Sequence, residues 1–185
     1  MRVVRVVLLV LAVGIAGCQR PTEQTAQAPG TQGGAAGPTP QPYGTLAQVM
    51  RGIPFPNSNI IFDTQDKDPA APVKPGDGGG ATNAYAGVYA GWQAVEQAAI
   101  ALSETANLIM IPGRMCENGL PAPLDREDYR KFAQGLADAG KAALKAAQSK
   151  NLDAMVEVSG TVSDACAACH EIYRDKPEGK MRCIP

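Results

Sequence analysis

The sequence contains little histidine, few aromatic residues and no excess of charge of either sign. His170 is the only histidine in 185 residues, which excludes any site built from several imidazoles, such as a histidine-rich zinc site or a haem held by two histidines. Aromatic residues make up 5% of the chain and alanine is plentiful, so the composition favours helices over a β-sandwich. The formal net charge of −1 provides no basic excess, and we expect no nucleic-acid partner.

The sequence also lacks an apolar run long enough to cross a bilayer. Arg2 and Arg5 precede an apolar run over residues 6–16, well short of the roughly 20 residues that a membrane-spanning helix needs. A positive start followed by a short apolar run is typical of a secretory signal peptide, which we place at residues 1–17. No second apolar run follows, so we expect membrane attachment to come from a lipid.

Cys18 is the predicted site of that lipid. The apolar run ends in Ile-Ala-Gly-Cys at residues 15–18, an order that resembles a bacterial lipobox, in which the cysteine becomes the lipidated first residue. An ordinary secretory signal with an unmodified cysteine is the alternative. Residues 18–43 are rich in proline, glycine and glutamine and hold too little apolar surface to fold. We predict a disordered tether reaching about 25–30 Å from the periplasmic side of a bacterial membrane.

The folded domain is predicted to cover residues 44–185. Residues 44–53 are a short helix candidate, because four apolar residues share one helical face: Leu46, Val49, Met50 and Ile53. Pro54 and Pro56 are expected to end this helix. An apolar patch over residues 57–63 is expected to pack on the core. Residues 64–82, rich in proline and glycine, are expected to form a loop.

Three longer segments carry apolar or small residues at alternating spacings of three and four, which is typical of nearly aligned, packed helices. The three stripes are Tyr85, Val88, Trp92, Val95, Ala99, Leu102, Ala106 and Ile109; Tyr129, Phe132, Leu136, Ala139, Ala143 and Ala146; and Leu152, Met155, Ser159, Val162, Cys166, Cys169 and Tyr173. One short and three long helices predict an all-α domain with the topology of an up-down-up-down four-helix bundle.

The run Cys-Ala-Ala-Cys-His at residues 166–170 is the strongest chemical signal in the sequence. Thiols three residues apart lie on one helix face, where Cys166 and Cys169 can add to the two vinyl groups of a haem, and His170 then lies beside the iron as an axial ligand. A redox-active pair of this spacing normally follows a strand, and a zinc site needs more ligands. We therefore predict one covalently attached haem c.

This prediction leaves an even number of cysteines after the lipid and the haem, so each of the five can be assigned a role. Cys18 takes the lipid and the motif takes two, which leaves Cys116 and Cys183. These two follow the first and last long helices, whose ends an up-down topology brings together, so we predict a disulfide in an oxidising periplasm. Two free thiols are the alternative.

The haem motif near the C-terminus and the predicted bundle resemble the class II cytochromes c, which include cytochrome c′ and its low-spin, Met-ligated relatives. The run Cys-Ala-Ala-Cys-His-Glu-Ile-Tyr-Arg at residues 166–174 is similar to the haem segment of that family, and the resemblance covers roughly residues 83–175. It implies that Arg174 lies over the proximal face of the haem and that Tyr173 is the family's neighbouring aromatic residue. Relatives often form homodimers, and a homodimer stays open here.

The resemblance also implies that the first helix supplies the residue over the distal face. Met50 is the core-facing candidate on that helix, and we assign to it the second axial position on the iron. Met155 lies about 22 Å along its helix from His170 and is too far away, whereas Met110 and Met115 remain alternatives. A methionine ligand gives a six-coordinate electron carrier. An apolar residue there would leave a five-coordinate haem that binds nitric oxide or carbon monoxide.

These features predict a lipid-anchored, periplasmic, mono-haem c-type cytochrome that carries single electrons between membrane-associated redox proteins. We expect no enzymatic activity, because the only histidine is assigned to the iron and leaves no imidazole for distal acid–base catalysis. The five-coordinate haem protein that binds nitric oxide or carbon monoxide is the alternative function.

Overall fold

The computed structural model describes residues 37–72, 90–175 and 182–184. From Thr39 onwards these residues belong to one compact unit. Apart from an isolated β-bridge between Met115 and Pro121, the regular structure of the described residues is helical, which confirms the predicted all-α class. None of the described helices combines the length and hydrophobicity needed to span a bilayer. The predicted signal peptide at 1–17, Cys18 and the tether up to residue 36 lie outside the described residues.

The predicted short helix is α1, Leu46–Gly52, which begins with a capping box. The Thr45 hydroxyl accepts a hydrogen bond from the Gln48 N–H at 3.2 Å, and the Gln48 side chain accepts one from the Thr45 N–H at 2.8 Å. These two bonds satisfy amides that have no partner inside the helix. The first turn of α1 is therefore specified by its own sequence.

Helix α1 ends at Gly52, just before the proline segment, as predicted. The helix that begins at Pro54 was not predicted. Helix α2, Pro54–Phe62, starts directly after Ile53. Pro54 and Pro56 lie in its first turn, where backbone N–H groups have no partner inside the helix, so the prolines remove no hydrogen bond. The expected apolar patch is the second half of α2. It packs on the core as predicted, with Ile61 fully buried.

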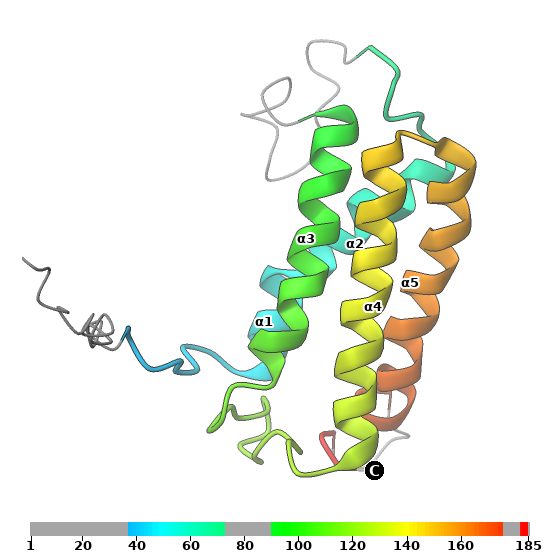
Figure 1. Ribbon diagram of the computed structural model, residues 1–185. Coiled ribbons are helices and arrows are strands. Elements are labelled where there is room, and N and C mark those ends of the chain that lie inside the picture. The colour runs from blue at the N-terminus through cyan, green and yellow to red at the C-terminus, as the bar shows by residue number, and fades with distance from the viewer. Residues whose placement is uncertain (1–36, 73–89, 176–181, 185) are drawn as a thin grey trace, which may run out of the picture. The chain divides into compact units, whose positions relative to one another are not determined.

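The three long stripes form α3, Gly91–Ile109, α4, Glu127–Ser149, and α5, Leu152–Tyr173. Figure 1 shows these helices side by side, with α1 and α2 along them. Helix α4 packs against both α3 and α5, and α2 also contacts both α3 and α5. The short 3₁₀-helix η1, Asp63–Gln65, follows α2 and contacts α5. Residues 73–89, including Tyr85 and Val88 of the first stripe, lie outside the described residues.

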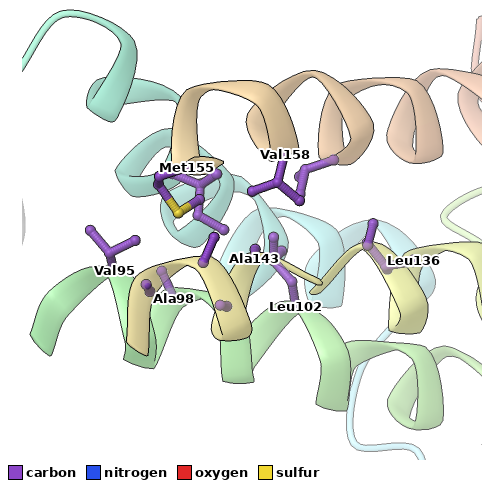
Figure 2. Packing of buried hydrophobic residues seen from close by; sticks show 13 residues of the cluster. Val95, Ala98, Leu102, Leu136, Ala143, Met155 and Val158 are labelled. Atoms are coloured by element: carbon purple, nitrogen blue, oxygen red, sulfur yellow. The ribbon is translucent and has the colours of Figure 1, made fainter. Parts of the chain in front are cut away.

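The core lies between α2, α3, α4 and α5 and is built largely from small residues. Figure 2 shows Leu102 and Leu136 on one side and Met155 and Val158 on the other, with Ala143 between them. Alanine and glycine on α4 allow its backbone to approach α3 closely. Gly140 lies at this approach, where an added Cβ would be 2.8 Å from the Ser103 backbone nitrogen, 3.1 Å from the Ala99 carbonyl oxygen and closer still to the Ser103 Oγ.

We predict that Gly140→Ala destabilises the protein by about 1–3 kcal/mol, because the new methyl group forces α3 and α4 apart. Gly135→Ala is the matched control, since Gly135 lies in the same helix and a Cβ there meets nothing within 4 Å. It should stabilise the protein by about 0.5–1 kcal/mol through helix propensity. Urea unfolding of both variants checks this, and equal effects of the two substitutions would show that the helix contact is not tight.

Candidate functional site

A single large cavity of about 1070 Å³ gathers most of the residues that the sequence marks out. Its size slightly exceeds the range of roughly 300–1000 Å³ that is usual for sites of cofactors and small ligands. The wall is formed by α1, α2, the end of α3, the start of α4 and the end of α5. Much of it is apolar, with Leu46, Phe62, Ile109, Phe132 and Leu136 among the lining residues.

Helix α5 brings all three residues of the haem motif to this cavity. Met155, Ser159 and Val162 on its buried face lie in the core, and the same face continues with Cys166 and Cys169. Both cysteines are half-buried free thiols, and both line the cavity together with His170. The core therefore sets the direction in which the two thiols point.

Burial keeps the titratable groups of the motif neutral. It raises the pKa of the Cys169 thiol to about 11, with smaller contributions from Cys166 and Asp128, and it also raises the pKa of Cys166. Burial, and next the Arg174 guanidinium, lower the pKa of His170 below its ordinary value. At neutral pH the site thus offers two S–H groups and a neutral imidazole, the form of histidine that binds metal ions.

Met50 on α1 lines the same cavity as His170. The other methionines in the described ranges do not line it: Met110, Met115 and Met155. Met155 is fully buried in the core, and Met115 is 41% exposed. Met181 lies outside the described residues. The structure therefore separates Met50 from Met110 and Met115, which the sequence alone could not do.

The end of α5 is held against the start of α4 by a polar network and by aromatic contacts. The Tyr173 hydroxyl donates to Asp128 Oδ1 at 2.8 Å and accepts from Arg126 Nε at 2.8 Å. Arg126 also donates to both carboxylate oxygens of Asp128, at 3.1 and 3.0 Å. The Tyr173 ring packs edge-on against Tyr129 and Phe132, with centroids 5.5 and 6.3 Å apart. These contacts fix the helix turn that carries His170.

Charged side chains line the cavity as pairs. Arg174 donates to its neighbour Asp175 at 2.6 and 2.9 Å and is exposed. Arg51 donates to Glu117 at 2.8 and 3.2 Å and is also exposed. Each pair is worth little energetically, because both partners are solvated. Arg51 and Glu117 nevertheless join α1 to the loop that follows α3.

Two segments of the cavity wall carry no sequence signal apart from their cysteines. The loop after α3 contributes Cys116, Glu117 and Asn118, and the C-terminal residues contribute Arg182 and Cys183. Cys116 and Cys183 form a disulfide, as predicted, with Cα atoms 6.4 Å apart. The pairing of these cysteines was the signal that could have placed both segments at the site. Phe132 and Leu136 were expected in the helix core, whereas they also form the wall of the cavity.

Comparisons with known proteins add no relatives to this picture. No protein-family model, curated protein or solved structure matches the chain. Within the described ranges, no group of three or more His, Cys, Asp and Glu side chains is placed to hold a metal ion. The chemistry of the site must therefore be argued from the cavity and the residues around it.

We predict that Asp128→Asn removes part of the acid sensitivity of the fold. Arg126, and next Tyr173, lower the pKa of Asp128 from its ordinary 3.8 to about 2. A depressed pKa stabilises the folded state fully above about pH 4, and this stabilisation is lost as the pH falls through 2. The stability difference between the native protein and the variant should therefore shrink between pH 4 and pH 2.

Urea unfolding between pH 6 and pH 2 measures this difference. Asp138→Asn is the control, because Asp138 lies on the exposed face of α4 and contacts only exposed side chains of the same helix, Gln134 at 2.8 Å and Lys141 at 3.5 Å. If the free energy of unfolding falls in parallel with pH in the native protein and in the Asp128→Asn variant, the network with Tyr173 does not cause the acid sensitivity.

Proposed function

We propose that this protein is a lipid-anchored, mono-haem c-type cytochrome of the class II kind, which carries single electrons between membrane-associated redox proteins. The observation that carries the proposal is that Cys166, Cys169 and His170, brought together by one helix, line a single large cavity that Met50 also lines. Two thiols, one imidazole and one thioether around a mostly apolar cavity are the groups that a covalently bound, six-coordinate haem requires.

In this proposal each residue of the site has a separate role. Cys166 and Cys169 would hold the haem covalently, and His170 and Met50 would be the two protein ligands of its iron. Haem, when bound, supplies an iron that takes up or releases one electron. The packing of α5 and the Tyr173 network keep His170 in place during that exchange, so little rearrangement accompanies it. Arg174 lies beside the proximal side and is a candidate for contact with the haem there.

We also infer that the helices form an up-down-up-down four-helix bundle whose first helix is broken at Pro54 into α1 and α2. The contacts of α4 with α3 and α5, and of α2 with the same two helices, support this arrangement. A bundle of this kind leaves room for a ligand between its helices, and the cavity between α1, α2, α4 and α5 is such a space.

The proposed location is the periplasmic side of a bacterial membrane. Residues 1–17 would direct export, Cys18 would carry the lipid, and the chain up to residue 43 would tether the haem domain at residues 44–185. A tether of this length confines the domain near the membrane and raises its effective concentration for redox partners there. The disulfide between Cys116 and Cys183 suits an oxidising compartment. A homodimer remains compatible with the proposal, and we propose no enzymatic activity.

One observation favours a second function, the binding of nitric oxide or carbon monoxide to a five-coordinate haem. Met50 is carried by a helix of only 7 residues, none of which is buried. The distal side is therefore less firmly built than the proximal side, where Tyr173 is 4% exposed. If Met50 does not ligate the iron, the distal side of the cavity is available to a small ligand.

The attachment of haem is tested by the mass and colour of the mature protein. Produced in a host with c-type haem maturation, the protein should be red and should retain the mass of one haem after denaturation. A Cys166→Ser, Cys169→Ser variant should lose the covalent haem, because no sulfur remains to bond to it. Ser163→Ala on the same helix is the control and should keep it. A colourless native protein with only the mass of the acylated polypeptide would refute the proposal.

The distal ligand is tested by Met50→Ala. The oxidised native protein should show the far-red charge-transfer band of a Met–iron bond, and its spectrum should respond little to carbon monoxide. The variant should lose this band, become high-spin and shift on addition of carbon monoxide. Met115→Ala, at an exposed methionine outside the cavity wall, should leave both spectra unchanged. A high-spin native protein that binds carbon monoxide would favour the second function.

A further inference from the structure

We infer that the Cys116–Cys183 disulfide positions Met50 opposite His170, so that its reduction opens the distal side of the cavity to a diatomic ligand such as carbon monoxide. The inference rests on the proposed haem function and deepens it, because it makes the choice between electron carrier and gas-binding protein depend on the redox state of two thiols. The structural basis is a chain of contacts that runs from α1 through the disulfide to the end of α5.

Helix α1 depends on its surroundings for its position. None of its 7 residues is buried, and its main contacts are with α2 and α3. It contributes no residue to the main core, which includes α2, α3, α4 and α5. The apolar anchor of α1 is instead Leu46, which packs against a separate small cluster formed by Cys116, Ala122 and Cys183. The disulfide is thus part of the surface on which α1 rests.

Two polar contacts connect α1 to the residues on either side of Cys116. The Leu46 N–H donates to the Met115 carbonyl oxygen at 2.8 Å. The Arg51 guanidinium pairs with the Glu117 carboxylate at 2.8 and 3.2 Å. These contacts lie on both sides of Met50 in the sequence, so the loop around Cys116 holds the turn that carries the proposed distal ligand.

The other half of the disulfide is connected to the helix that carries the proximal ligand. The Cys183 N–H donates to the Tyr173 carbonyl oxygen at 2.9 Å, one helical turn after His170. The Asn118 side chain donates to the Arg182 carbonyl oxygen at 2.9 Å and adds a second contact between the loop and the C-terminal residues. The disulfide therefore joins the loop at Cys116, which contacts α1, to Cys183, which is hydrogen-bonded to the end of α5.

Reduction would break this connection without removing the core. A dithiol reductant transfers two electrons and two protons, so the S–S bond breaks, Cys116 and Cys183 become thiols, and the reductant becomes its own disulfide. The two cysteines are 3% and 7% exposed, whereas the neighbouring Met115, Glu117 and Arg182 are exposed. A small dithiol therefore needs only a local opening of this loop. The connection across the cavity then rests on weak polar contacts, and Met50 can leave the iron.

The first test compares carbon monoxide binding by the ferrous full-length protein with and without the disulfide. We expect the protein treated with dithiothreitol, and separately the Cys116→Ser, Cys183→Ser variant, to bind carbon monoxide at least tenfold more tightly than the ferrous protein whose disulfide is intact. The far-red Met–iron band of the oxidised iron should weaken in parallel. If the variant does not fold, chemical reduction of the folded protein still provides the comparison. Unchanged affinity and an unchanged band would overturn the inference.

A matched control separates this positioning role from general destabilisation. Leu102→Ala removes a fully buried side chain of the main core that does not line the cavity, and it should lower stability without tightening the binding of carbon monoxide. Equal tightening in Leu102→Ala and in the disulfide variant would overturn the inference, because any loss of stability would then have the same effect.

Hydrogen exchange provides a readout that does not depend on haem. On reduction, the amides of α1 over residues 46–52 should exchange at least tenfold faster, while those in the middle of α4 should change little. Equal acceleration in both helices, or none in α1, would contradict the positioning role. A protein without haem in which α1 still loosens would refute the proposed function alone. A Met-ligated haem that is indifferent to the disulfide would refute only this inference.

Discussion

The burial of one face of α5 is the constraint on which the rest of the site depends. Met155, Ser159 and Val162 hold the first half of that face in the core, where all three are fully shielded from solvent. A helix transmits this orientation along its length, because its side chains repeat every 3.6 residues. Cys166 and Cys169 are therefore aimed into the cavity by residues up to about four turns away. The position of the cavity and the chemistry of its wall both follow from the packing of this helix.

The two sides of the cavity are built with different firmness. On the α5 side, Tyr173 is packed against two aromatic rings of α4 and bonded to Asp128 and Arg126. On the α1 side, a short helix rests on a loop, one exposed ion pair and a small cluster around a disulfide. A proximal ligand on the well-packed α5 side and a distal ligand on the less well-packed α1 side would allow the distal ligand to exchange while the proximal ligand stays in place.

The segment after Pro54 shows what local reasoning left undecided. The prolines were expected to end the first helix, and α1 does end at Gly52, but proline breaks a helix only where its missing N–H or its ring meets the preceding turn. In the first turn of α2 neither cost arises, and Ile61 on the same helix is fully buried. The second helix was not predicted, because its apolar residues pack on a core built from α3, α4 and α5, and this information lies outside the proline positions themselves.

The sequence by itself determined the helical stripes, the all-α class and the spacing of Cys166, Cys169 and His170, because helical periodicity relates residues only a few positions apart. It also singled out Cys116 and Cys183 as partners by elimination. Only the tertiary structure decided that Met50 lines the cavity while Met110 and Met115 do not, that Arg51 pairs with Glu117, and that the disulfide lies beneath α1. These facts depend on how distant segments of the chain come together; Cys116 and Cys183 alone are 67 residues apart. No local pattern encodes that arrangement, because it is set by the packing of the whole core.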